Sequence, residues 1–337
     1  MNAIPFLSAA SLAQAPTWQG AVEALISGHR LPRAQISDTT LANGDRQLMS
    51  RLAWIDGLGA AVKSFSVLAA NPRREPPLPS VQGACLLLDD ATGAPVAMID
   101  FALLTWWKTA ADSVLGAMLL GPEKPRSLVV IGAGTVARSL CEAYAALFPS
   151  LRMITVCARR RDAAEACLAA LPPTNASLLA SCDPEAAVSS ADIVATATAS
   201  NDPVLKGCWL RPGTHVDLVG AYAASMREAD DATLMRGELF VDCRDTTLEH
   251  IGELLIPIER QVISADEVRG DFYDLLASDS RLRVKPKRGE RGERGESGDK
   301  GDKGDKGDKG ESITVFKNGG GAHLDLMIAH YFRTLAQ

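Results

Sequence analysis

The chain has 337 residues, which is longer than one typical domain and favours two. Its hydrophobic content of 47% is typical of a soluble globular protein with a substantial core, and its net charge of −6 gives no support to nucleic-acid binding. No apolar run reaches about 18 residues, so no transmembrane helix is expected.

The N-terminal region has no Lys or Arg before its apolar part, so we predict no signal peptide and a cytoplasmic location. The seven cysteines are scattered and lack metal-ligand spacing, which indicates small, reduced core residues of a cytosolic protein. The sequence therefore predicts no metal site.

The first 120 residues predict short strands between two helices. The first helix is expected over 18–27, ended by Gly28, and the second over 103–120, ended by Gly121 and Pro122. Turn signals separate four strand-like segments, at 48–56, 60–70, 81–90 and 95–100. Successive short strands of this kind predict an antiparallel or mixed sheet.

A glycine-rich loop follows an apolar run at the centre of the chain. Gly132, Gly134 and Ala137 match G-x-G-x-x-A: the first glycine permits a tight turn, the second lets a pyrophosphate approach, and the alanine lets helix and strand pack closely. Thr135 and Val136 begin the following helix, whose free N–H groups can face phosphates. The loop therefore predicts dinucleotide binding, although a glycine turn that binds nothing is the alternative.

From 127 to about 263 the chain alternates strands and helices, which predicts an α/β, doubly wound parallel sheet. The expected strands are 128–131, 153–158, 193–198, 215–220 and 239–243, and the expected helices are 136–147, 161–171, 227–235, 246–257 and 267–277.

Glycine recurs at every third position between 289 and 310, in a segment rich in Asp, Glu and Lys and without proline. Burial of so few apolar residues cannot offset the conformational entropy that the segment would lose on ordering. We therefore predict a disordered insertion. A collagen-like assembly module is the alternative. Structure is expected to resume with a strand at 313–317 and a helix at 322–335.

Nine motifs are spread along the chain: LPR (31–33), VKS (62–64), NP (71–72), VQGACLLLDDATGAPVAMID (81–100), KTAADSVLGA (108–117), VVIGAGTVA (129–137), ATATASNDPVL (195–205), GTHVDLVGAYAASMRE (213–228) and VFKNGGGAHLDL (315–326). In these motifs the chain resembles the ornithine cyclodeaminase/mu-crystallin family. The resemblance implies a homodimer in which a Rossmann domain is inserted in a smaller α+β substrate and dimerisation domain. The implied division is 1–110 with 313–337, then 111–288, with the insertion at 289–312.

The resemblance places Arg33, Lys63 and Lys108 at substrate-binding basic positions, where they would clamp a carboxylate. Lys108 departs from the family, in which Arg is usual, and a lysine holds a carboxylate as a point charge without a two-pronged fork. Thr109, beside it, can hydrogen-bond substrate or cofactor, or only cap a helix. A solvated surface cation is the alternative for each basic residue.

Tyr222 separates the imine-reducing members from the cyclodeaminases. Cyclodeaminases of the family carry an aspartate at this loop position, and a phenol with a pKa near 10 cannot replace a carboxylate base at neutral pH. The pattern is similar to that of Δ1-pyrroline-2-carboxylate reductases, which implies reduction of a cyclic imine. Tyr222 either donates a hydrogen bond or walls the pocket, and Asp217, inside the preceding strand, does not replace the missing aspartate.

Cofactor selection is expected after the second strand of the Rossmann unit. Arg159 and Arg160 follow this strand, and no acid occurs there before Asp162. Arginines at this position favour NADPH, which carries a 2′-phosphate, over NADH, although an exposed basic loop is the alternative. Thr196 and Thr198 follow the next strand and can line the nicotinamide side. The resemblance places Lys317 in a segment that folds over the cofactor or active site.

The expected activity is therefore NADPH-dependent reduction of Δ1-pyrroline-2-carboxylate, or of the six-membered Δ1-piperideine-2-carboxylate, in proline or hydroxyproline metabolism. Three alternatives stay open: an ornithine cyclodeaminase, a mu-crystallin-like protein that binds NADPH and a small ligand, and an alanine dehydrogenase. The partners expected are a small imino acid and a second copy of the chain. Asp325 is interpreted as a structural acid.

Overall fold

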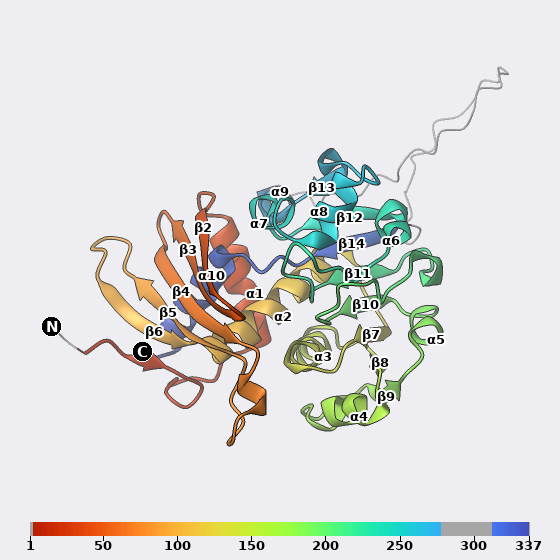
Figure 1. Cartoon of the computed structure of the whole chain (residues 1–337), viewed down its shortest axis with the longest axis horizontal. Helices are drawn as coiled ribbons and strands as arrows, with labels where there is room; N and C mark the ends of the chain where they lie inside the picture. Colours follow the sequence, from red (N-terminus) through yellow and green to blue (C-terminus); the bar gives the residue numbers. More distant parts are fainter. Residues whose placement is uncertain (1–2, 278–311, 337) are drawn as a thin grey trace, which may run out of the picture.

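The computed structural model describes residues 3–277 and 312–336, which form two lobes, one around each of two sheets (Figure 1). The predicted insertion at 289–312 lies outside these residues, apart from its last position. Within the described part of the chain, no helix has the length and apolar character needed to cross a membrane. The prediction that the cysteines are small core residues holds for five of them; Cys182 and Cys208 are exposed.

The first lobe contains a six-stranded sheet of order β1-β6-β5-β4-β3-β2. Its strands are β1 (Phe6–Leu7), β2 (Gln35–Asn43), β3 (Arg46–Ile55), β4 (Gly59–Leu68), β5 (Val81–Leu88) and β6 (Pro95–Asp100). All pairings are antiparallel except that between β1 and β6. The four predicted strands are confirmed. The prediction missed β2, whose residues are polar and exposed for most of its length.

Three helices cover one face of this sheet: α1 (Trp18–His29), α2 (Phe101–Leu120) and α10 (Ala322–Leu335). The Thr17 hydroxyl caps α1, and Asp100 caps α2 by accepting from the Leu103 N–H. Gly28 does not end α1 as predicted. A Cβ there would lie 2.4 Å from the Met327 side chain, so the glycine instead lets α10 approach α1.

The second lobe contains an eight-stranded parallel sheet, which confirms the predicted doubly wound fold. Its order is β13-β12-β14-β11-β10-β7-β8-β9. The strands are β7 (Ser127–Ile131), β8 (Met153–Cys157), β9 (Ser177–Ser181), β10 (Ile193–Thr196), β11 (His215–Leu218), β12 (Gly237–Val241), β13 (Val268–Gly270) and β14 (Ile313–Lys317). The chain order reverses between β7 and β10, and ligands of open α/β sheets bind at such switch points.

Helices flank the parallel sheet on both faces (Figure 1). They are α3 (Thr135–Leu147), α4 (Arg161–Ala169), α5 (Pro184–Val188), α6 (Asp231–Arg236), α7 (Arg244–Thr247), α8 (Gly252–Glu259) and α9 (Phe272–Ala277), with 3₁₀ turns at Asn71–Arg73, Gly207–Trp209 and Ala265–Glu267. The predicted helix at 246–257 is wrong as one element. It is interrupted before Gly252, whose N–H donates to the Ala223 carbonyl. The predicted helix at 267–277 is also wrong as one element, because β13 occupies Val268–Gly270 and α9 begins only at Phe272.

One predicted boundary is wrong, because β14 belongs to the parallel sheet. It pairs with β11 on one side and with β12 on the other, and all five of its residues are buried. A strand that is buried along its whole length fits the middle of a parallel sheet, which is covered on both faces. The chain returns to the first lobe only with α10, while α2 runs across the predicted boundary at residue 110.

Candidate active site

The loop after β7 has the backbone geometry that a dinucleotide requires. Gly132 has φ +126°, its N–H donates to the Cys157 carbonyl, and a Cβ would lie 2.4 Å from the Ala197 carbonyl oxygen. Gly134 is the N-cap of α3, and a Cβ added there would meet only open space within 4 Å. The first glycine is therefore needed by the fold, and the second leaves the surface free for a ligand.

The start of α3 completes this loop. Thr135 and Val136 occupy the first turn, where backbone N–H groups have no partner within the helix, and Ala137 is fully buried against the sheet. An anion such as a pyrophosphate fits the open space over Gly134, facing these N–H groups and the positive end of the helix dipole.

The two arginines predicted to select the cofactor lie after β8, the neighbour of β7 in the sheet. Arg159 and Arg160 are exposed, and Arg160 lies 3.6 Å from the exposed Asp162 carboxylate. Because both side chains are exposed and a surface ion pair of this kind is weak, both guanidinium groups are accessible to a ligand.

Thr196 and Thr198 contact Glu228, a buried residue that the sequence motifs did not single out. Both hydroxyls donate to its carboxylate, at 2.7 Å each, and the Gly220 N–H donates to the same group at 2.5 Å. Glu228 therefore joins the loops after β10 and β11, and the Thr196 hydroxyl is engaged within the protein. The motif at 213–228 ends on this residue but does not indicate its role.

Lys63 and Lys108 meet at Asp325, as two buried cations around one buried carboxylate. The Lys63 ammonium donates to Asp325 Oδ1 at 2.9 Å and to the Thr105 hydroxyl at 3.0 Å. The Lys108 ammonium lies 3.6 Å from the same Oδ1 and donates to the Gly320 carbonyl. The interpretation of both lysines as solvated surface cations is wrong, because each is only 4% exposed.

The third cation of this cluster is Arg51, not Arg33. Arg51 donates to the Gly320 carbonyl at 2.8 Å, next to Lys108. Arg33 instead pairs with Asp271 at 2.7 Å and with Asp245 at 3.0 Å. No local sequence pattern pointed to Arg51, since the pairing of β3 with β4 that brings it beside Lys63 is set by the register of the strands.

Burial and charge change the pKa values in this cluster. Burial lowers the pKa of Lys108 to about 8, although the Asp325 carboxylate opposes the shift. Burial alone would raise the pKa of Asp325, but Lys108, Lys63 and Arg51 hold it below its ordinary value. Asp325 is therefore ionised at neutral pH, and Lys108 loses its charge in mildly alkaline solution.

The cation cluster lies at the carboxyl ends of the parallel strands. Just after β14, the Asn318 amide donates to the Thr109 carbonyl at 3.0 Å and to the Ser113 hydroxyl at 2.9 Å. Lys317 donates to the Leu218 carbonyl at 2.8 Å, at the end of β11. Three strand spacings separate β14 from β7, roughly 14 Å, which is a distance that a dinucleotide spans.

Further site residues stand apart from the cluster. The Tyr222 side chain is 68% exposed on the loop after β11. Thr109 lies inside α2, so the interpretation of this residue as a helix cap is wrong; its carbonyl accepts from Asn318. Asp217 is fully buried and accepts hydrogen bonds from Ser113 and Tyr144, each at 3.1 Å.

Two more buried acids lie near this junction. Asp242 accepts a hydrogen bond from the Gly320 N–H, and Asp112 has no hydrogen-bond partner among the described residues. Burial raises the pKa of both carboxyls. Among the described residues, no group of His, Cys, Asp and Glu could hold a metal ion.

The parallel sheet with its glycine loop at the switch point defines a Rossmann-type, dinucleotide-binding protein, here with a buried cation cluster at the edge where the ligand would lie. The model of the ornithine cyclodeaminase/mu-crystallin family matches residues 32–336. The chain belongs to this family.

A curated relative and two solved structures are similar to this chain over nearly its whole length. A Δ1-pyrroline-2-carboxylate reductase of Paracoccus denitrificans is 48% identical over 330 residues, which cover 98% of this chain and 96% of the relative. The solved structure of a Thermococcus litoralis Δ1-pyrroline-2-carboxylate reductase with NADH and L-proline is 22% identical, with a TM-score of 0.79 and coverage of 98% and 97%. An archaeal alanine dehydrogenase dimer with bound NAD is 23% identical, with a TM-score of 0.80 and coverage of 99% and 96%.

Proposed function

We propose that the chain is an NADPH-dependent reductase that converts Δ1-pyrroline-2-carboxylate to L-proline and accepts the six-membered Δ1-piperideine-2-carboxylate. The observation that carries this proposal is the buried cluster of Lys63 and Lys108 at the carboxyl edge of the dinucleotide-binding sheet. The close relative from Paracoccus denitrificans supports the choice of substrate.

In this proposal the two ammonium groups hold the substrate carboxylate, and Asp325 holds the two lysine side chains in place. When bound, the reduced nicotinamide supplies a hydride ion to the imine carbon. Since Lys63 and Lys108 share one acceptor atom, their ammonium groups lie close together and can hold the carboxylate in front of the sheet edge. Tyr222, exposed on its loop, lines the entrance without a polar role, so turnover by Tyr222→Phe is expected to equal that of the wild type.

A cyclodeaminase is disfavoured by the position of the nearest acids. Such an enzyme needs a carboxylate base at the loop after β11, where Tyr222 stands. Asp217, at the preceding strand, is bound by Ser113 and Tyr144, and burial raises its pKa to about 7. The structure therefore offers no free carboxylate on that loop segment, among the residues described.

The preference for NADPH over NADH rests on Arg159 and Arg160. Both are exposed after β8, next to the strand that ends in the glycine loop, where a 2′-phosphate would lie. We expect Arg159→Ser combined with Arg160→Ser to raise the KM for NADPH at least tenfold and to leave the KM for NADH nearly unchanged.

The function is tested by following NADPH oxidation with Δ1-pyrroline-2-carboxylate and by measuring ammonia release from ornithine in parallel. Rapid oxidation without ammonia release is expected. Ammonia release without oxidation would favour the cyclodeaminase, and tight NADPH binding without either activity would favour a binding protein. Turnover of pyruvate and ammonia in place of the cyclic imine would favour an alanine dehydrogenase.

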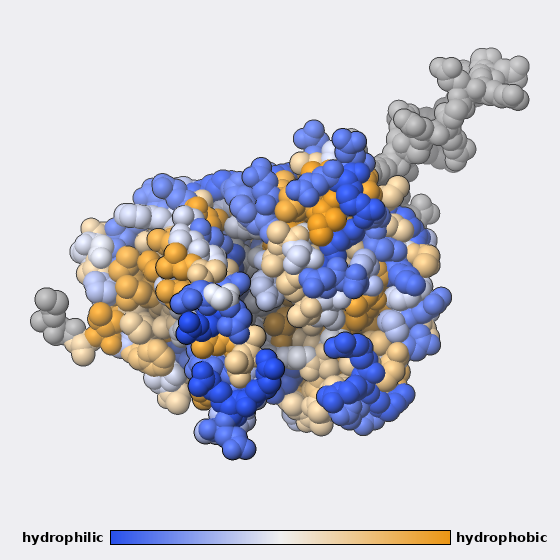
Figure 2. Space-filling model, viewed as in Figure 1, coloured by the Kyte–Doolittle hydropathy of each residue, from blue (hydrophilic) through white to orange (hydrophobic). Residues whose placement is uncertain are grey.

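A homodimer is also part of the proposal, because the outer face of the antiparallel sheet is apolar. The exposed side chains on this face are Phe6, Leu41, Leu48, Leu52, Trp54 and Met98. Figure 2 shows hydrophobic residues gathered over this lobe, and the surface is hollowed between the two lobes. A contiguous apolar face of this kind marks an interaction surface, and a second copy of the same sheet is its proposed partner.

A further inference from the structure

We propose that Arg51 supplies the guanidinium fork that binds the substrate carboxylate, and thereby determines specificity for carboxylated imines. This inference rests on the proposed function and adds a residue to the same site. Lys63 and Lys108 are point charges that fix no plane, whereas a guanidinium can grip both oxygens of a carboxylate at once. Arg51 is the guanidinium of the described cation cluster.

Strand register places Arg51 inside the molecule and beside Lys63. The two residues are direct partners in the pairing of β3 with β4, and Asp38 is the partner of Arg51 on the other side. Arg51 shares its face of the sheet with the buried Ala53 and Ile55. Side chains of Arg51 and Lys63 therefore project together toward α10 and α2.

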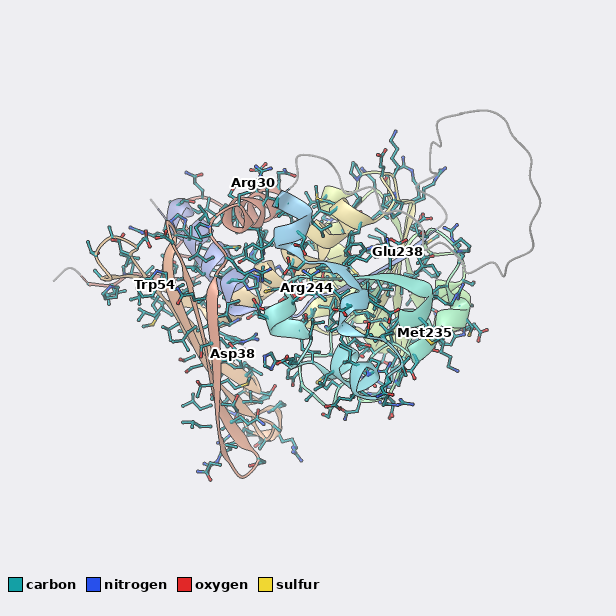
Figure 3. All side chains as sticks on the ribbon, turned by 90° about the horizontal axis from the view of Figure 1, so that it is seen from above. Arg30, Asp38, Trp54, Met235, Glu238 and Arg244 are labelled. Atoms are coloured by element: carbon teal, nitrogen blue, oxygen red, sulfur yellow. The ribbon has the colours of Figure 1, made fainter. Side chains whose placement is uncertain are left out.

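Two contacts fix the orientation of the guanidinium. Asp38 accepts from Nε and lies 2.8 Å from Nη2, and the Gly320 carbonyl accepts from Nη1 at 2.8 Å. In Figure 3 Asp38 lies on the side of the sheet that faces the parallel-sheet lobe. Three of the five N–H groups are thus engaged by described residues, which leaves one N–H on each terminal nitrogen for a ligand.

Gly320 brings Arg51 and Lys108 to one point. Both donate to its carbonyl oxygen, so their nitrogen atoms lie within about 6 Å of each other. A carboxylate at this point would contact the fork of Arg51 and the ammonium of Lys108 together. Lys63 and Lys108 contact the buried Asp325, and Arg51 pairs with the partly buried Asp38 at the edge of the cluster. The other two buried acids nearby, Asp112 and Asp242, have pKa values raised by burial, which favours their neutral forms and leaves the three cations able to accept a bound anion.

Arg33 cannot take this role while its ion pairs persist. Its guanidinium is bound by two carboxylates, Asp271 and Asp245, and stacks over the Tyr273 ring at 4.4 Å. The two arginines thus differ in the charge that remains available to a ligand. Two carboxylates neutralise Arg33, whereas Arg51 contacts only one, the half-exposed Asp38, and the uncharged Gly320 carbonyl.

The test measures the affinity of NADPH-loaded protein for pyrrole-2-carboxylate, a planar carboxylate probe, by titration calorimetry. We expect Arg51→Gln to weaken binding about 10- to 100-fold, the usual effect of losing a hydrogen bond to a charged group. Arg51→Lys keeps the charge and loses the fork, so it should weaken binding about 3- to 10-fold. Arg46→Gln, on the exposed start of the same strand, is the matched control and should bind like the wild type.

Kinetics provide the second readout. Arg51→Gln should raise the KM for Δ1-pyrroline-2-carboxylate by the same factor, with a smaller change in kcat, and should not change kcat/KM for Δ1-pyrroline, which lacks the carboxylate. Unchanged binding by both Arg51 variants, or a loss confined to Arg33→Gln, would overturn the inference. If Arg51→Gln does not fold, Arg51→Lys carries the test alone. Inactivity of the wild type with Δ1-pyrroline-2-carboxylate would contradict the proposed function, while probe binding would still decide the role of Arg51.

Discussion

The charge of Lys108 is predicted to control substrate affinity in alkaline solution. Burial lowers its pKa to about 8, so the ammonium is charged below that pH and increasingly neutral above it. We expect kcat/KM for Δ1-pyrroline-2-carboxylate to fall up to tenfold per pH unit above about pH 8, mainly through KM. Steady-state kinetics between pH 6 and 10, at saturating NADPH, measure this decrease.

Lys108→Arg provides the control, because a guanidinium stays charged throughout this range. The decrease above about pH 8 should disappear in this variant, whereas any titration of the substrate itself would affect both proteins equally. Identical pH profiles for the two proteins would show that Lys108 does not titrate where its environment predicts.

Asp217 is predicted to make stability depend on pH. Its pKa is raised by burial to about 7, while the unfolded chain has its ordinary value near 4. Between these values the native state holds a proton that the unfolded state has lost, so stability is present at low pH and is lost as pH rises to about 7. The free energy of unfolding should therefore fall by about 2–3 kcal/mol between pH 5 and 8, relative to that of Asp217→Asn.

Urea denaturation of both proteins at pH 5, 6, 7 and 8 measures this difference. The asparagine cannot ionise, so its own cost, from altered bonds to Ser113 and Tyr144, is the same at each pH. Parallel curves for the two proteins would mean that Asp217 keeps its ordinary pKa in the folded state.

At the scale of single elements, alanine substitutions of the two glycines between β7 and α3 are predicted to have different effects, one on stability and the other on cofactor binding. Gly132→Ala places a side chain at φ +126° and within 2.4 Å of the Ala197 carbonyl, so it should destabilise the fold by about 2–4 kcal/mol. Gly134→Ala meets open space, so stability should change by less than about 0.5 kcal/mol. Its methyl group would instead hinder the pyrophosphate and weaken NADPH binding at least tenfold.

Chemical denaturation without ligand, together with fluorescence titration of NADPH, separates the two effects. Each alanine variant serves as the control for the other, since they differ by two positions in one loop. Equal losses of stability would contradict the assignment of Gly132 to the fold and of Gly134 to the ligand.

Elements with a strong local pattern were predictable from the sequence. The apolar run before Gly132 and the alternating segments around Lys63 indicated the correct strands and their sheet types. β2 was missed because its exposed polar residues have no periodic signal. β14 was found as a strand but assigned to the wrong lobe, because pairing between strands far apart in the chain leaves no local mark.

The site was predictable where a motif carried it. Lys63 and Lys108 follow from motifs, and the structure brings them together at Asp325. Arg51 could not be found, because it becomes a neighbour of Lys63 only through the register of β3 with β4. Glu228 likewise acts through contacts with two loops that meet only in the folded chain.

At the scale of the whole molecule, α2 connects the cation cluster with the edge of the parallel sheet. It presents Lys108 to the cation cluster, and just over one helical turn further on its Ser113 hydroxyl accepts from Asn318 at the edge of the parallel sheet. The groups that we propose to bind the carboxylate come from the antiparallel lobe, and the glycine loop proposed to bind the dinucleotide comes from the parallel lobe (Figure 1). A change in the angle between the lobes would therefore alter the distance between substrate and cofactor.

The outer face of the antiparallel sheet is predicted to hold two copies of the chain together. Trp54 is 57% exposed there, and in Figure 3 it lies on the side of the sheet that faces away from the parallel-sheet lobe. A stable interface buries about 800 Å² on each partner, with aromatic residues contributing most to affinity. Trp54→Glu places a charge in this interface, so it should weaken self-association at least a hundredfold, since burying an unpaired charge costs several kcal/mol.

Sedimentation velocity over a range of protein concentrations measures this association. Met235→Glu is the matched control, because Met235 is also exposed but lies on the parallel-sheet lobe, at the opposite side of the molecule (Figure 3). Wild type and Met235→Glu are expected to sediment as dimers, and Trp54→Glu as a folded monomer that still binds NADPH, because the dinucleotide loop is far from this face. A dimeric Trp54→Glu variant would place the interface elsewhere, and a monomeric wild type would remove the dimer from the proposal.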